Sequence, residues 1–160
     1  MAVGKTTSTV TVNAAFLQEI KEVNAELWKL LDDVRHLCHD PHYVRSHRRR
    51  LVLMLGSLRD QLALHFALEE AYGYFDDPVF VAPQLSHNAA TLRDEHRTLY
   101  SKVCELADEV EKQYYAGRLV TVASHVVRQF MAFDELFRRH ENDENELILR
   151  AYEDDIGVGD

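Results

Sequence analysis

The apolar residues of this chain recur at helical spacing over four long segments, and this periodicity limits the possible folds more than any other feature. Spacings of three and four residues place side chains on one face of an α-helix. The pattern predicts helices over residues 14–39, 43–74, 87–114 and 119–152. Six Gly and three Pro in the whole chain disfavour a turn-rich all-β fold. We therefore expect an all-α protein, an up-down-up-down antiparallel four-helix bundle.

The length of 160 residues suits one domain with a core of its own. The bundle is expected over residues 14–152. Residues 1–13 are rich in Thr and lack a helical stripe, so we expect a flexible leader. Their TVTV run could form a short strand, but the sequence offers it no obvious partner strand. Residues 153–160 are expected to form an acidic tail.

The net charge of −9 makes nucleic acid and anionic membranes improbable as main partners. No stretch near the start of the sequence resembles a signal peptide, and no apolar run approaches the length of a membrane span. Two Cys are too few for a disulfide framework. These features predict a cytoplasmic protein. Its nine His are an unusual number for this length.

Histidines interrupt the apolar stripes at three positions, and two of them precede a carboxylate by four residues. His65 pairs in this way with Glu69, and His140 with Glu144, while His96 stands alone. Residues four apart share one helix face, so both pairs point into the core. A buried carboxylate is unfavourable unless its charge is compensated, and the neighbouring stripe positions hold no basic residue. A cation would resolve the conflict, and these ligand types suit non-haem iron.

The three histidines are also expected at one height in the bundle. Reflection of His65 about the loop near residue 80 leads close to His96, and reflection of His96 about the loop near residue 116 leads close to His140. The mismatch is within about one helical turn, ~5 Å. The alternative is three core histidines with ordinary hydrogen bonds, which their common height makes less favourable.

The motifs HFALEE at 65–70, DEH at 94–96 and HENDE at 140–144 resemble those of the hemerythrin HHE cation-binding domain family. The resemblance covers roughly residues 14–152. It implies a non-haem diiron centre with an oxo, hydroxo or water bridge. In such a centre His65, His96 and His140 would be terminal ligands, and Glu69 and Glu144 would bridge the metals. Related domains bind dioxygen, sense oxygen or iron, or act in nitric oxide and iron–sulfur stress responses.

The chain departs from this family in its first predicted helix, which has no His at the height of the site. Reflection of His65 about the turn near residue 41 gives residues 18–24, where Asn24 occupies a stripe position. We expect Asn24 to replace a first-helix His, either as a weak ligand or as a buried residue that fixes register. Glu141, beside His140, could reach an open metal position or face solvent.

Without metal, Glu69 and Glu144 would face each other across the core. Burial and mutual repulsion are expected to raise the pKa values of both carboxyl groups. Metal binding displaces their protons, so metal affinity should fall as the pH falls.

Three functions remain open at the level of the sequence. The first is a carrier or sensor that binds iron and, at an open position, dioxygen or another diatomic. The second is a diiron oxidoreductase acting on peroxide, nitric oxide or dioxygen, although no separate acid–base pair or substrate-pocket motif favours it. The third is a metal-free helical module for interaction with another protein.

Overall fold

The protein is all-α apart from one short two-stranded sheet. The structure is a computed structural model and describes residues 9–76 and 82–157. Its elements follow the order β1 (Val10–Val12), α1 (Ala14–Val23), α2 (Ala25–Leu37), α3 (Pro41–Ser46), α4 (Arg48–Leu68), the π-helical turn η1 (Glu69–Gly73), β2 (Tyr74–Asp76), α5 (Pro83–Tyr115) and α6 (Leu119–Gly157).

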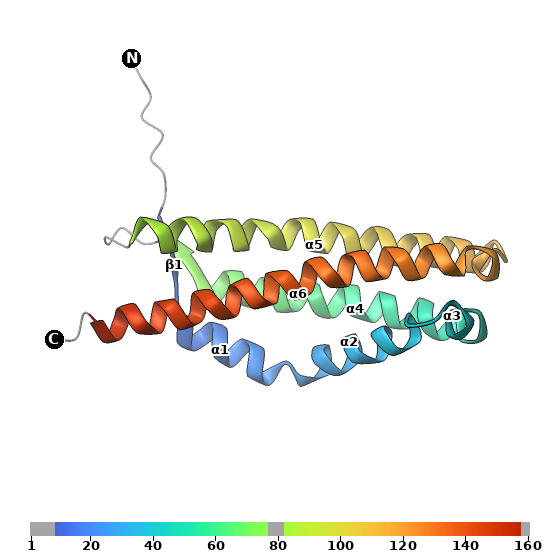
Figure 1. Cartoon of the computed structure of the whole chain (residues 1–160), viewed down its shortest axis with the longest axis horizontal. Helices are drawn as coiled ribbons and strands as arrows, with labels where there is room; N and C mark the ends of the chain where they lie inside the picture. Colours follow the sequence, from blue (N-terminus) through green and yellow to red (C-terminus); the bar gives the residue numbers. More distant parts are fainter. Residues whose placement is uncertain (1–8, 77–81, 158–160) are drawn as a thin grey trace, which may run out of the picture.

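The long helices run side by side along the longest axis of the molecule (Figure 1). α4 packs against α2 and α5, and α6 packs against α5, α3 and α1. The colours of Figure 1 show that the chain reverses direction between α2 and α4, between α4 and α5, and between α5 and α6. The α3 end of the molecule lies opposite the β1 end.

The core consists of two apolar clusters. The large apolar cluster is built from α2, α3, α4, the later part of α5 and the first half of α6, and it includes Leu55, Leu58 and Phe130. The small apolar cluster lies toward the β1 end. Its buried members are Val10, Ala14, Leu17, Tyr74, Ala89, Leu92, Leu147 and Ile148. In α5 and α6 the buried polar residues His96, His140 and Glu144 lie between members of the two clusters.

The first predicted helix is broken where one continuous helix was expected. Asn24 has φ −91° and ψ 48°, which ends α1 before α2 begins. The indole Nε1 of Trp28 donates a hydrogen bond of 2.8 Å to the carbonyl oxygen of Lys21. This bond satisfies a carbonyl at the end of α1, where helical partners are missing.

The second predicted helix also differs from the expected 43–74. A break at His47 separates α3 from α4, and α4 continues into the π-helical turn η1 and then the strand β2. A π-helical turn holds one extra residue, so the helix phase shifts after Leu68. Gly73 closes this turn against α1, where a Cβ atom would overlap the side chain of Leu17.

The expectation of a flexible leader over residues 1–13 was wrong for Val10–Val12, which form a strand. Val10–Val12 pair antiparallel with Tyr74–Asp76, with Thr11 opposite Phe75. The partner strand was missed because residues 74–76 were assigned to the end of a helix and the loop after it. α6 continues to Gly157 and so includes much of the expected acidic tail 153–160. Residues 1–8, 77–81 and 158–160 lie outside the described residues.

Within the described residues, one helical stretch is long and apolar enough by length and composition to cross a membrane, Arg48–Gly73. A core helix of a helical bundle meets the same criteria. This stretch supplies the large apolar cluster with four Leu side chains that have no exposed surface, Leu51, Leu55, Leu58 and Leu62.

Candidate metal centre

The structure brings the five predicted ligands together in one buried layer between the two apolar clusters. α4 contributes His65, η1 contributes Glu69, and α5 contributes His96. α6 contributes His140 and Glu144, and all five side chains are at most 3% exposed. We call these five residues together with Lys21 the polar layer.

The ligand atoms form two groups that could each hold a metal ion. His96, His140 and Glu144 form the first group, and His65, Glu69 and Glu141 form the second. Within each group one ligand atom per residue lies within 4.8 Å of the others. Nε2 of His96 lies 3.8 Å from a carboxylate oxygen of both Glu69 and Glu144, so the two groups adjoin each other.

The unpartnered polar atoms of this layer fit a cation. Among the described residues, buried side-chain atoms without a hydrogen-bond partner are concentrated here. They include Nε2 of His65, His96 and His140 and oxygens of Glu69 and Glu144. Buried polar groups are rarely left without partners in native proteins. Imidazole nitrogens and carboxylate oxygens are also the donors that iron accepts in helical bundles.

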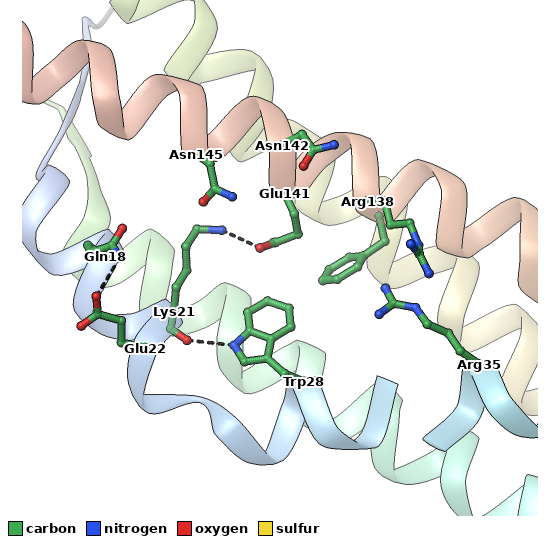
Figure 2. A pocket seen from close by; sticks show the side chains of 10 residues that line it. Gln18, Lys21, Glu22, Trp28, Arg35, Arg138, Glu141, Asn142 and Asn145 are labelled. Carbon is green, nitrogen blue, oxygen red and sulfur yellow. Dashed lines mark hydrogen bonds and ion pairs between the residues drawn. The ribbon is translucent and has the colours of Figure 1, made fainter. Parts of the chain in front are cut away.

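A lysine that the sequence analysis missed also lies in this layer. Lys21 of α1 is 9% exposed, and its Nζ lies 2.5 Å from Glu141 Oε2 and 2.8 Å from Glu144 Oε1. Figure 2 shows its side chain reaching from α1 to Glu141 on α6. The expectation that no basic residue neighbours the carboxylates was therefore wrong. Lys21 supplies part of the charge compensation that the two buried Glu require.

Asn24 lies at the height of the site, as expected, but on the outer side of His65. Its amide Nδ2 is 2.9 Å from His65 Nδ1, the ring nitrogen that points away from Glu69. His65 Nε2 lies 3.0 Å from Glu69 Oε1. The Asn24 side chain therefore orients the imidazole of His65 from behind.

Two further side chains hold the first group in place. Nδ1 of His140 lies 2.8 Å from Glu95 Oε2, so an Nδ1–H donates to this carboxylate and Nε2 faces the site. A carboxylate behind a metal-binding His commonly orients the ring in this way. The hydroxyl of Tyr74 donates a 2.6 Å hydrogen bond to Glu144 Oε2. Tyr72, which lies nearer to Glu69 in the sequence, is exposed instead.

Burial and charge shift the pKa values of the layer in opposite directions. Burial and repulsion from Glu144 raise the pKa of Glu69 well above its ordinary value, as expected. Burial also raises the pKa of Glu144, but hydrogen bonds from Glu69, His140 and His96 and the charge of Lys21 outweigh it and hold this pKa well below its ordinary value. The expected rise at Glu144 was therefore wrong.

Burial and neighbouring charges also shift the pKa values of the basic groups Lys21 and His65. Burial lowers the pKa of Lys21, yet the charges of Glu144, Glu141 and Glu69 more than compensate, so the pKa rises and the ammonium stays charged. Burial, together with the positive charge of Lys21, lowers the pKa of His65 to about 4 despite the opposing charge of Glu144. The second group thus holds a neutral imidazole beside a fixed positive charge.

Aromatic rings close the layer toward the large apolar cluster. The ring of Phe66 stacks on His96 with centroids 4.3 Å apart, and it meets His140 edge-on at 6.1 Å. The indole of Trp28 meets His65 edge-on at 5.5 Å. These rings exclude water from one side of the site, which strengthens electrostatic interactions inside it.

A surface cavity of about 440 Å³ borders the layer at Lys21. It lies between α1, α2 and α6, and Lys21, Glu141, Trp28 and Phe137 are among its lining residues. Figure 2 shows that the Lys21–Glu141 pair lies on the wall of this cavity. Glu141 is the member of the second group that lines this cavity.

One signal in the sequence could have identified Lys21. Leu17, Lys21, Asn24 and Trp28 also follow helical spacing, so a stripe drawn through them places Lys21 at the height of the site. Tyr74 carried no such signal, because the extra residue of the π-helical turn moves it onto the buried face.

Comparison with known families supports the same reading of the residues. The family model "Hemerythrin HHE cation binding domain" matches residues 15–152, which is most of the chain. Comparisons with curated proteins and with solved structures give no match.

Proposed function

The chain belongs to the hemerythrin HHE cation-binding domain family, and on this basis we propose that it is a non-haem iron-binding protein. The helices are proposed to form an up-down-up-down antiparallel four-helix bundle in which α1 and α2 together take the place of the first helix. The polar layer would hold the iron. The family match supports cation binding, and the His and Glu groups support a metal site in this layer.

The observation that carries the proposal is the first group. One ligand atom each of His96, His140 and Glu144 converge within 4.8 Å, and Nε2 of both histidines has no hydrogen-bond partner. Two imidazoles and one carboxylate are the donor set of many non-haem Fe(II) sites that keep open positions. Glu69 is near enough to His96 to add a second carboxylate. A bound iron would supply an open coordination position for dioxygen or another diatomic ligand, which suits a carrier or a sensor.

The residues around the group have separate tasks in this proposal. Glu95 holds the proton of His140 at Nδ1 and keeps Nε2 directed inward. Tyr74 donates to Glu144 and fixes the orientation of its carboxylate. Phe66 and Trp28 exclude water from the side of the large apolar cluster. The family resemblance implies two iron ions with a bridging oxygen. Such a centre would require both groups of ligands to be filled.

The cavity beside Lys21 favours an oxidoreductase as a second candidate. At about 440 Å³ it has room for more than a diatomic molecule. Steady turnover of peroxide or nitric oxide would support this candidate, whereas reversible spectral changes with dioxygen would support the carrier or sensor.

An anaerobic Fe(II) titration of metal-free protein tests the proposal. We expect tight uptake, measured by elemental analysis after gel filtration, and a rise in Tm. At free iron 100 times the Kd, the stabilisation is about 2.7 kcal/mol. His140→Ala should abolish uptake, and His125→Ala, an exposed His on the same helix, should not. Metal-free protein that takes up no iron and has an unchanged Tm would overturn the proposal in favour of a metal-free helical module.

A further inference from the structure

We propose that the ammonium group of Lys21 is a permanent cation of the metal centre, and that the centre therefore holds one iron ion at His96, His140 and Glu144. The inference rests on the proposed iron binding and concerns how the polar layer is filled. It replaces the two-iron expectation that the family resemblance implies.

The position of Lys21 is the first reason. Its Nζ lies 2.5 Å from Glu141 Oε2 and 2.8 Å from Glu144 Oε1, and thus contacts a carboxylate from each of the two groups. An ammonium has three donors and no lone pair, so it binds carboxylates but cannot bind a metal. It occupies Glu141 Oε2, one carboxylate oxygen of the second group, and its charge repels a second ion at short range.

The charge of the layer is the second reason. Metal binding displaces the proton of Glu69, so the filled site brings together three negative charges, on Glu69 and Glu144 of the layer and on the adjoining Glu141, and the one positive charge of Lys21. One divalent ion balances the remaining two charges. A second divalent ion would leave a buried excess of positive charge, which is strongly unfavourable unless further anions enter.

The hydrogen bonds behind the two imidazoles differ, and this is the third reason. An Nδ1–H of His140 donates to Glu95, so its Nε2 carries a free lone pair toward the first group. The Asn24 amide Nδ2 lies 2.9 Å from His65 Nδ1, and an N–H donated there favours the tautomer that carries the ring proton on Nε2, the atom that faces Glu69. A protonated Nε2 cannot bind a metal. A second ion would have to displace this proton, so the second group binds metal less readily than the first.

The stoichiometry of the unmodified protein is the first test. Metal-free protein titrated anaerobically with Fe(II) should bind one iron per chain. Crystals of the loaded protein should show one peak in an anomalous-scattering map at the iron edge, beside His96 and His140. Two irons per chain, or one peak beside His65, would overturn the inference and leave the proposed iron binding intact. No uptake at all would overturn the proposed function itself.

Removal of the lysine is the second test. Lys21→Ala removes both the charge and the bulk of the side chain, and we expect the variant to bind a second iron per chain. Lys29→Ala is the matched control, because Lys29 is 79% exposed and pairs only with Asp33 among the described residues. It should bind one iron. A helical Lys21→Ala variant that still binds one iron would show that Lys21 does not limit the stoichiometry. If this variant fails to fold, the count and the map of the unmodified protein decide alone.

Discussion

The large apolar cluster and the polar layer are built largely from the same helices, but they differ in regularity. In the cluster, α4 presents Leu51, Leu55, Leu58 and Leu62 at unbroken spacings of four, three and four residues. Around the polar layer, α1 ends at Asn24, α4 gives way to a π-helical turn, and a small sheet forms beside it. Each irregularity positions a polar side chain that regular helices would direct elsewhere.

This difference divides stability from binding within one fold. Apolar side chains without exposed surface stabilise the large cluster through burial and dispersion. The polar layer instead contains buried atoms without partners, which oppose folding in the metal-free protein. We therefore expect changes in the cluster to lower stability without altering iron binding, and changes around the polar layer to alter both.

The largest expected effect on the free energy of unfolding comes from a substitution in the large apolar cluster. Leu58→Ala removes a side chain with no exposed surface and should lower the free energy of unfolding by about 2–5 kcal/mol. Urea titration of metal-free protein measures this change. Leu64→Ala, at a position 58% exposed on the same helix, should change it by less than about 0.5 kcal/mol. The comparison would fail if Leu58→Ala also changed the iron bound per folded chain.

The next effect is a pH dependence that belongs to the polar layer. The pKa of His65 falls from 6.5 to about 4 on folding. Below pH 6.5 the unfolded chain takes up a proton at this residue and the folded chain does not, so stability falls as the pH falls. The loss approaches about 3 kcal/mol near pH 4. Urea titrations of metal-free protein from pH 7 to pH 4 measure this slope.

His65→Gln should remove this part of the pH dependence, because an amide does not titrate. His125→Gln, at an exposed position on α6, is the control and should follow the unmodified protein. Equal slopes for all three proteins would mean that His65 is not kept neutral by its surroundings.

The residues that sequence analysis found and missed follow the same division. His65, His96 and His140 could be placed at one height because α4, α5 and α6 are long and regular there, so counting residues from the loops was sufficient. Lys21 was missed because the apolar Ile20 beside it also fits helical spacing, and the break at Asn24 changes the helix direction. Tyr74 was missed because the π-helical turn adds a residue that no periodic pattern indicates.

Gly73→Ala tests whether the π-helical turn is needed to position Tyr74. The added Cβ would overlap Leu17, and such overpacking costs about 1–3 kcal/mol. It should also disturb the Tyr74–Glu144 hydrogen bond and weaken iron binding. Gly56→Ala is the matched control, because its nearest contact is Arg59 Nη2 at 3.9 Å, and it should stabilise α4 by about 0.5–1 kcal/mol. Thermal unfolding with and without iron distinguishes the two variants.

The smallest effect on stability is expected at Asn24, where one atom type decides the chemistry of His65. Asn24→Asp keeps the side-chain shape but replaces the NH2 donor with an acceptor, so the ring proton moves to Nδ1 and Nε2 becomes a free ligand. In the unmodified background Lys21 still excludes a second ion, and one iron should bind. In the Lys21→Ala background, Asn24→Asp should tighten the second iron by about 10-fold or more, the typical size of an outer hydrogen-bond effect. Asn24→Leu can neither donate nor accept a hydrogen bond. In the Lys21→Ala background its affinity for the second iron should lie between the affinity with Asn24 and the affinity with Asp at this position. An anaerobic Fe(II) titration of Lys21→Ala alone, and of Lys21→Ala combined with Asn24→Asp or with Asn24→Leu, measures the order of these affinities. If Asp and Leu bind the second iron equally, the hydrogen bond behind His65 does not govern its ligand atom, and the difference between the two imidazoles has another cause.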